Sequence, residues 1–311
     1  MRPLARRHEL GWGAAILAAL GALALLPLSV QRNDVLNFLF VILLSITLAQ
    51  SWNIVAGYAG QVNLGHAAFF GLGALVARTL WLQGTPILLA MAAGAAAATV
   101  SALAIGAAAF RLRGAYFAIG TLALGEILRT TVGNALPEIS TLPSAAIAGY
   151  RLTLRYYMAL GLAALSVMAV AVLATSRAGL GMQAVREDEE AAEASGVGAL
   201  PLKLAALALS SGLAGLAGGL FAYYHISYYP SHAFSPTWTF DALLMTFIGG
   251  VGTLQGPVLG AVLYVLLKEY LAVRWVDFHL LIFGALFVLI VLALPGGLVQ
   301  AAERARRLFA R

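Results

Sequence analysis

The segment that decides the fold of this chain is VLNFLFVILLSITLAQSWNIVA, residues 35–56. It contains no charged residue and is long enough to cross the hydrocarbon core of a bilayer, which takes about 20 helical residues. Of all 311 residues, 61% are hydrophobic and only 10% are charged, against roughly 25% charged in soluble domains. The apolar runs are continuous rather than alternating, as in membrane helices and unlike barrel strands. We therefore expect an all-α, polytopic helical membrane protein.

Further apolar runs lie on both sides of this segment. Full-length runs occupy residues 12–30, 64–82, 86–110, 114–133, 155–175, 204–224 and 278–294, and shorter ones occupy 239–248 and 256–267. Because the two short runs can be counted or not, we predict eight to ten transmembrane segments. Together they form a single membrane-spanning domain over residues 1–311, and the polar residues 176–203 form a loop outside the membrane.

Basic residues indicate which connections face the cytoplasm, where short loops are enriched in lysine and arginine. They gather at both ends of the chain, at Arg111 and Arg113, and in the loop before Lys203, whereas Arg151 and Arg155 run against the trend. The pattern predicts that both termini and loop 176–203 are cytoplasmic. The same basic residues account for the net charge of +6, because they anchor the protein at the surface of the lipid bilayer. We therefore expect no nucleic acid partner.

The sequence lacks the motifs of several functional classes. It has no cysteine, and neither Lys203 nor Lys268 follows a glycine, so a nucleotide-binding P-loop is absent. His66 has no second ligand at helical spacing, and no cluster of catalytic groups is visible. We expect a protein that is not an enzyme, with no catalytic residue, no metal and no cofactor.

Two glycine-rich stretches, residues 57–66 and 249–257, interrupt the helical pattern. Glycine costs a helix interior about 1 kcal/mol relative to alanine, and paired broken segments in a membrane protein point to a transport pathway. The alternative is an ordinary turn between helices. Both interpretations stay open for the first stretch, but we expect a discontinuous helix at the second, because residues 239–248 are too short to span. The candidate pathway residues are Gly60, Gln61, Asn63, Gly65, Glu126, Gly250, Gly252 and Gln255.

Other features of the apolar runs also have two interpretations. Glu126 and Arg129 have the spacing of a local ion pair, which we favour over a lining of the pathway. The small residues at 211–219 allow close helix packing, within this subunit or, less favoured, at a subunit interface. Arg78 is expected to anchor a helix end at the membrane surface, and the aromatic residues between 223 and 238 to form an interfacial belt.

A polar stretch, residues 186–196, lies between two apolar runs and has the sequence REDEEAAEASG. Its pattern Glu-Ala-Ala-x-x-x-Gly, formed by Glu190, Ala191, Ala192 and Gly196, resembles the cytoplasmic coupling loop of the membrane subunits of ABC importers. The resemblance implies that these four residues, with Arg186, fit a groove of an ATPase partner. The surrounding acidic residues suit a basic rim on that partner.

Four blocks in order resemble the permease subunits of branched-chain amino acid ABC importers, over about residues 35–298. They lie at residues 51–69, 111–119, 190–196 and 249–260, and the block Arg-Leu-Arg-Gly-x-Tyr-Phe at 111–117 resembles the second of the two permease types. The resemblance implies a bacterial inner-membrane permease that translocates branched-chain amino acids or related solutes. It further implies a homologous permease as heterodimer partner, two cytosolic ATP-binding subunits and a periplasmic substrate-binding protein.

The chain departs from this family's pattern after residue 133. A Thr-Gly-Gly-Ser-Asn-Gly-like stretch is usual there, whereas residues 138–146 read EISTLPSAA. The departure leaves the solute open among branched-chain amino acids, other amino acids, urea and short amides. An alternative function is a self-contained, ion-coupled secondary transporter of a small polar solute, in which the acidic loop is an ordinary connector.

Overall fold

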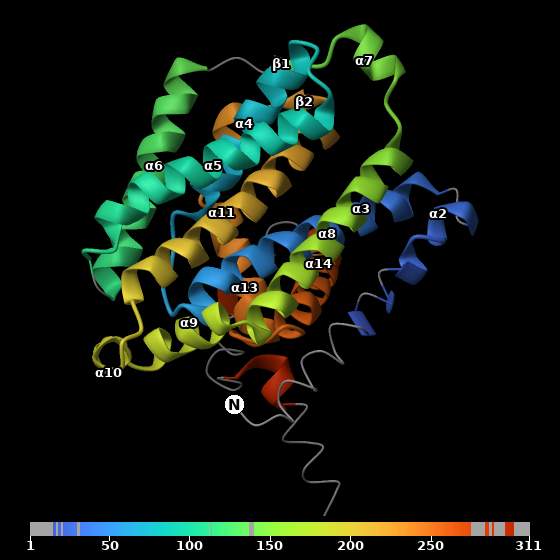
Figure 1. Ribbon diagram of the computed structural model, residues 1–311. Helices are drawn as coiled ribbons and strands as arrows, with labels where there is room; N and C mark the ends of the chain where they lie inside the picture. The colour runs from blue at the N-terminus through green and yellow to red at the C-terminus, as the bar shows by residue number, and fades with distance from the viewer. Residues whose placement is uncertain are drawn as a thin grey trace, which may run out of the picture.

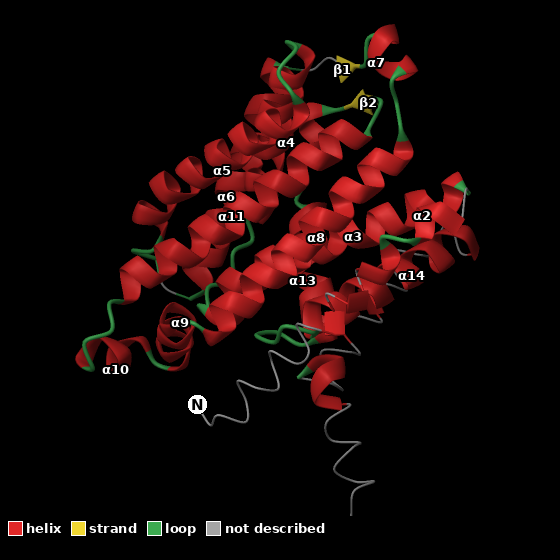
Figure 2. Cartoon of the chain, turned by 45° about the vertical axis from the view of Figure 1, so that its right-hand side comes forward, coloured by secondary structure: helices red, strands yellow, loops and turns green. Residues whose placement is uncertain are grey.

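The computed structural model describes residues 15–16, 18–19, 21–29, 32–112, 114–136, 140–274, 284–285, 288 and 296–301. Its main helices form a tilted bundle (Figures 1 and 2) and are α3 (Asn33–Asn53), α4 (His66–Leu82), α5 (Ile87–Ala109), α6 (Ala115–Ala135), α8 (Leu152–Thr175), α11 (Ala199–Tyr224), α13 (Thr237–Gly249) and α14 (Gly256–Arg274). Shorter elements are α2 (Leu26–Ser29), the π-helix η1 (Ile54–Tyr58), α7 (Ser144–Ala148), α9 (Arg177–Glu187), α10 (Glu189–Ala194), α12 (Pro230–Ala233), β1 (Ser140–Thr141) and β2 (Ser227–Tyr228). The predicted all-α class is confirmed.

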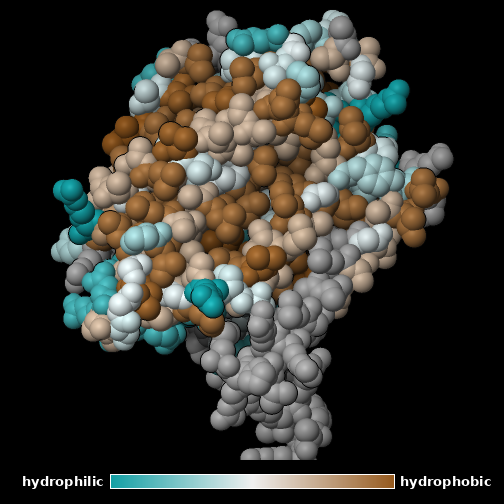
Figure 3. Space-filling view, in the orientation of Figure 1, coloured by the Kyte–Doolittle hydropathy of each residue, from teal (hydrophilic) through white to brown (hydrophobic). Residues whose placement is uncertain are grey.

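Four helices of the described part are long and apolar enough to cross a membrane: Asn33–Tyr58, Ile87–Ala109, Leu152–Thr175 and Ala199–Tyr224. Apolar side chains cover most of the flank of the bundle, with hydrophilic surface mainly toward its ends (Figure 3). The protein is therefore a multi-pass membrane protein. The runs predicted at 12–30 and 278–294 lie largely outside the described residues.

The bundle has two polar ends. Helices α9 and α10 lie at one, which we call the α9 end, and the strands β1 and β2 with α7 lie at the other, which we call the β end (Figure 1). The strands pair antiparallel, with Ser140 opposite Tyr228. Helix α11 runs between the two ends, from Ala199 near α10 to Tyr224 just before β2.

Small residues let α11 approach α4 and α5 closely. A Cβ on Gly218 would lie 1.9 Å from the carbonyl oxygen of Phe70, and one on Gly73 would lie 2.1 Å from that of Gly215. Both contacts join backbone to backbone, so no larger side chain fits. The favoured interpretation of residues 211–219, packing within the subunit, is confirmed for these glycines.

Arg78 is a structural centre of the β end and not the expected surface anchor. Its side chain is only 2% exposed. The guanidinium donates to the carbonyl oxygens of Ala222 (3.0 Å), His225 (3.0 Å), Ser140 (2.7 Å) and Ile226 (3.0 Å). The carbonyls come from segments far apart in sequence, so Arg78 satisfies the end of α11 and joins it to both strands. The pKa of the nearby His225 is lowered to about 4, mainly by burial and, in the same direction, by the charges of His232 and Arg78.

Candidate translocation and coupling site

The first glycine stretch interrupts a membrane-spanning path. Helix α3 continues through η1, and the chain then runs without helix from Gly60, whose φ is +71°, to Gly65. A Cβ on Gly65 would lie 2.2 Å from the carbonyl oxygen of Thr121, and a Cβ on Gly125 would lie 3.4 Å from the Cα of Gly65. Thr121 and Gly125 lie near the middle of α6, so the first residues of α4 lie beside the middle of α6. Of the two interpretations left open, the structure favours the interrupted helix.

Side chains replace the missing helical hydrogen bonds of this segment. The indole nitrogen of Trp52 donates to the carbonyl oxygen of Asn63 (2.9 Å). Asn63 Oδ1 accepts from the amide of Gly65 (2.9 Å), and Thr121 Oγ1 accepts from the amide of Leu64 (3.1 Å). Asn63 is fully buried, whereas Gln61 is partly exposed and donates to the carbonyl oxygen of Ala59 (3.3 Å). Buried backbone groups need such partners wherever helix is absent.

The second glycine stretch is a turn between two antiparallel helices, and the expectation of a discontinuous helix there was wrong. Asp241, early in α13, accepts from Lys268 Nζ (2.8 Å), late in α14. A Cβ on Gly260 would lie 1.8 Å from the carbonyl oxygen of Met245, and one on Gly249 would lie 1.7 Å from that of Gly256. These glycines serve close approach of α13 and α14, so the chain reverses instead of continuing.

The interruption that shortens α13 lies before it, at the bend of residues 234–236 that follows α12. Of the aromatic residues expected at the membrane surface, Phe234 is buried and the partly exposed Trp238 stacks on Phe70 with ring centroids 4.7 Å apart, whereas Tyr229 is 52% exposed. The amide of Ala67 donates to Thr239 Oγ1 (2.8 Å). The first turns of α4 and α13 therefore lie side by side, and from there α4 runs toward the β end and α13 toward the α9 end.

The two glycine stretches contact each other. Asn53 Nδ2 donates to the carbonyl oxygen of Thr253 (3.0 Å), and Asn53 Oδ1 accepts from the amide of Gly252 (2.8 Å). Gln50 Nε2 donates to the carbonyl oxygen of Leu254 (2.7 Å). α3 thus holds the turn of residues 250–255 by its side chains. The neighbouring Gln255 is buried, with only 5% of its surface exposed, and Gly250 has a φ of +130°.

Arg186 connects the coupling segment to both glycine stretches. Its guanidinium donates to the carbonyl oxygen of Gly57. A Cβ on Gly252 would lie 2.5 Å from Arg186 Nη1, and one on Gly60 would lie 2.8 Å from Arg186 Cγ. The group borders a cavity of about 330 Å³ lined by Tyr58, Ala174, Gln183, Ala184, Arg186, Glu187 and Gly252. Arg186 therefore contacts its own subunit, while the residue also remains exposed, so its predicted contact with a partner stays a prediction.

The other predicted coupling residues lie on α10 and just after it. Glu190, Ala191 and Gly196 are exposed, whereas Ala192 is buried against Val185 and Ala199. Gly196 has a φ of +82°, and a Cβ there would meet nothing within 4 Å. Position 196 requires glycine because of the backbone conformation there, and not because a side chain would clash with a neighbour.

Two polar contacts secure α10. Asp188 Oδ1 accepts from the amide of Ala191 (3.0 Å) and caps the helix. Glu189 pairs with the buried Lys203 of α11 at 2.5 Å. The ion pair fixes α10 to the start of α11 at the α9 end.

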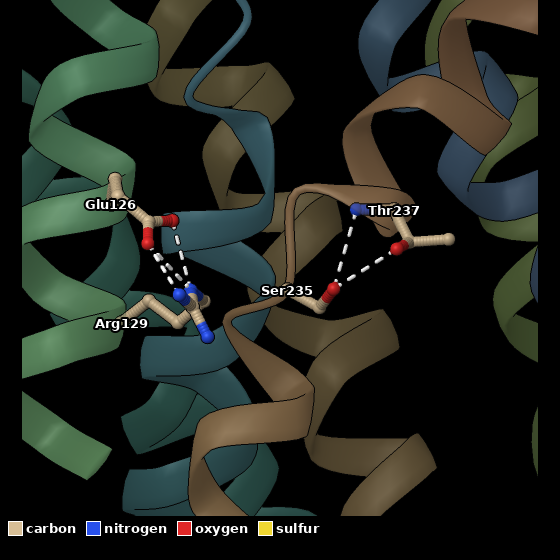
Figure 4. Close-up of polar contacts among 4 residues, drawn as sticks. All are labelled: Glu126, Arg129, Ser235 and Thr237. Atoms are coloured by element: carbon tan, nitrogen blue, oxygen red, sulfur yellow. Dashed lines mark hydrogen bonds and ion pairs between the residues drawn. The ribbon is translucent and has the colours of Figure 1, made fainter.

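Glu126 and Arg129 form the predicted ion pair on α6. Arg129 Nε donates to Glu126 Oε2 at 2.8 Å. The pair points toward the α12–α13 bend, where Ser235 and Thr237 lie (Figure 4). It stands apart from the Arg186 contacts, so the structure divides the candidate residues between the α9 end and the middle of α6.

These features define a polytopic helical permease: apolar helices, a chain interrupted at mid-depth, and a polar segment that reaches the interruption. The family described as branched-chain amino acid transport system, permease component, matches residues 35–291. The chain belongs to this family and is a permease subunit of an ABC importer, a class that works with other ABC components. Members of the family are transport components and not enzymes.

Relatives bear the same description. The high-affinity branched-chain amino acid transport system permease protein LivM of Salmonella typhimurium and that of Escherichia coli are each 27% identical over 306 residues, covering 88% of this chain and 71% of the relative. A probable LivM of Methanocaldococcus jannaschii is 29% identical over 133 residues, 38% of each chain. No solved structure matches.

Proposed function

We propose that this chain forms a translocation pathway for branched-chain amino acids across the bacterial inner membrane. The solute is that named for the LivM relatives, which share 27% identity with most of this chain. In this proposal residues 1–311 are one permease domain with both termini in the cytoplasm, and residues 176–203 are its coupling segment. A homologous permease completes a heterodimer, and a periplasmic binding protein delivers the solute at the β end. Two cytosolic subunits hydrolyse ATP, so this chain needs no cofactor and catalyses no reaction.

The observation that supports ATP coupling is the position of Arg186. Exposed residues of α10 at the α9 end offer a surface to an ATPase, while Arg186, on the adjoining helix, contacts the carbonyl oxygen of Gly57 and approaches Gly252. Movement of α9 and α10 would therefore act directly on the two glycine stretches. Rigid elements that shift about such contacts are the usual basis of domain-scale switching.

The first glycine stretch is the element through which such movement would reach the pathway. Residues 60–65 connect the Arg186 contact with the start of α4 in the middle of the bundle. Irregular backbone at that depth is tolerated only where it is buried in protein or lines a cavity. Displacement of Gly57 and Gly60 would thus shift residues 61–65 and the first turn of α4, opening or closing the path.

The test is transport by the complex purified with its associated subunits and reconstituted in liposomes. We expect leucine uptake that requires ATP and survives collapse of ion gradients. Arg186→Gln should retain insertion and basal ATP hydrolysis but lose most uptake, while Arg177→Gln, an exposed arginine on the same helix, should transport normally. Uptake by the chain alone, driven by an ion gradient, would instead establish a secondary transporter.

A further inference from the structure

The Glu126–Arg129 pair lies where a membrane would surround α6. At 1.5 Å per residue, Glu126 is roughly 17 Å from the start of the helix, and the side chains of Arg129 and Glu126 are 40% and 44% exposed. Charge at the bilayer centre costs at least about 2.5–3.5 kcal/mol. A half-exposed pair at this depth must therefore face water or another protein, and not lipid.

The packing of α6 shows which way Arg129 points. The buried residues of this helix recur every four positions, at Phe117, Thr121 and Gly125. The stripe continues at Gly133, where an added Cβ would lie 3.4 Å from Ser231 Cβ of α12. Arg129 falls on the same stripe, between the contact with Gly65 and the contact with Ser231, so it faces the interior side of α6.

A cavity occupies this interval. It has a volume of about 510 Å³ and is lined by Arg129, Tyr229, Ser231, His232 and Ser235. Sites for small molecules commonly measure about 300–1,000 Å³. Across from the ion pair, Ser235 Oγ and Thr237 Oγ1 lie 3.0 Å apart at the α12–α13 bend (Figure 4). The cavity thus offers hydroxyl groups and the guanidinium of Arg129. The carboxylate of Glu126 does not line the cavity itself but is paired with that guanidinium at its edge.

This set of groups matches a zwitterion. An α-amino acid carries a carboxylate, which an arginine binds with two parallel hydrogen bonds. It also carries an ammonium group, which donates hydrogen bonds to a carboxylate. Without solute, Glu126 and Arg129 satisfy each other, so neither charge is left unpaired at depth. With solute, each can exchange its partner for the opposite charge of the amino acid.

We propose that the cavity between α6 and the α12–α13 bend recognises the charged head of an α-amino acid during translocation. Arg129 binds the carboxylate, Glu126 binds the ammonium group, and Ser231 and Ser235 contribute hydroxyls. The inference rests on the proposed function, since it assigns that solute a place in the pathway.

The first test uses the absence of cysteine from the sequence. Ser235→Cys in the purified complex is exposed to a membrane-impermeant maleimide, with and without nucleotide, and labelling is read from the mass of this chain. We expect labelling that L-leucine slows at least fivefold in one of the two states. 4-Methylpentanoate, which lacks the ammonium group, and 3-methylbutylamine, which lacks the carboxylate, should slow it less than twofold.

Controls keep this test decisive. Ile127→Cys lies on α6, the helix of the ion pair, at a position that is 60% exposed, and leucine should not protect it. Ser231→Cys serves if Ser235→Cys fails to assemble. Absence of labelling, or equal rates with and without leucine in both states, would overturn the proposal.

The second test separates recognition from a structural ion pair. The double variant Glu126→Arg with Arg129→Glu keeps a pair but reverses its order along α6. We expect assembly and basal ATP hydrolysis to persist while leucine uptake falls at least tenfold. Normal uptake would show that the pair only stabilises the helix. Failure of the wild-type complex to import leucine would instead count against the proposed function. The failure of the proposed function can therefore be told apart from the failure of the proposed binding site.

Discussion

The first glycine stretch, residues 57–66, and the second, residues 249–257, look alike in sequence but differ in the structure. In the first, the helix is lost, and side chains of Trp52, Asn63 and Thr121 replace its hydrogen bonds. In the second, the glycines let two helices approach until backbone touches backbone. Glycines in such stretches are needed for two physical reasons, conformational freedom and absence of a side chain, and each stretch contains both kinds. Gly60 and Gly250 have a positive φ, whereas Gly65 and Gly249 lie in close backbone contact, and only the three-dimensional contacts show which reason applies.

The largest effect is expected at a close contact between α13 and α14, the helices that the second stretch joins. Gly260→Val would place its Cβ 1.8 Å from the carbonyl oxygen of Met245, which the backbone cannot avoid. We expect loss of monodisperse protein in size-exclusion chromatography. Gly161→Val, on α8 where nothing lies within 4 Å, should elute normally. A well-assembled Gly260→Val protein would show that the hairpin is not closely packed.

A smaller effect on folding, with a strong effect on transport, is expected where glycine meets Arg186. At Gly60 and Gly252 the shortest contact of an added Cβ is with the flexible side chain of Arg186, and backbone atoms lie no closer than 3.0 Å. The positive φ costs a non-glycine residue about 1–2 kcal/mol. Gly60→Val and Gly252→Val should therefore insert and assemble but lose at least tenfold in uptake. Normal uptake by both variants would remove these glycines from the pathway.

An intermediate change is expected on removing the link between α3 and the second stretch. Asn53→Ala leaves the amide of Gly252 and the carbonyl of Thr253 without their partner. A fully buried group left unsatisfied costs about 1–3 kcal/mol, and these two groups are partly buried, so the cost should be smaller for each. We expect a lower melting temperature and uptake reduced several-fold. Asn33→Ala, exposed at the other end of α3, is the matched control, and equal melting temperatures would argue against the link.

The smallest effect is expected far from both stretches, at His225. Because burial lowers its folded pKa to about 4 from the ordinary 6.5, the unfolded chain binds the proton more readily between these values, so stability falls as pH drops from 6.5 toward 4. Thermal unfolding at pH 7 and pH 5 should show a smaller loss in His225→Gln than in the wild type. An unchanged pH dependence would contradict the buried, neutral state of His225.

Several features were predictable because they depend on local composition. Long apolar runs identify the helices, and the spacing of Glu126 and Arg129 predicted their ion pair, which the structure contains. The motif at residues 190–196 and three further blocks predicted the family that the comparison shows. The predictions that were wrong concerned residues whose partners are distant in the sequence. Arg78 was predicted to anchor a helix end at the membrane surface, but it is held by four carbonyl acceptors from other segments. The bend before α13 was missed because aromatic residues suit both a membrane surface and a buried stack.

The sequence by itself determined that this chain is a helical membrane permease, because hydrophobic length and short motifs are properties of contiguous residues. Only the tertiary structure decided that α4 and α13 begin side by side, and that Arg186 reaches both glycine stretches. Those contacts join residues more than a hundred positions apart, such as Arg186 with Gly57 and Ala67 with Thr239. They arise from the packing of whole helices, which no local pattern specifies.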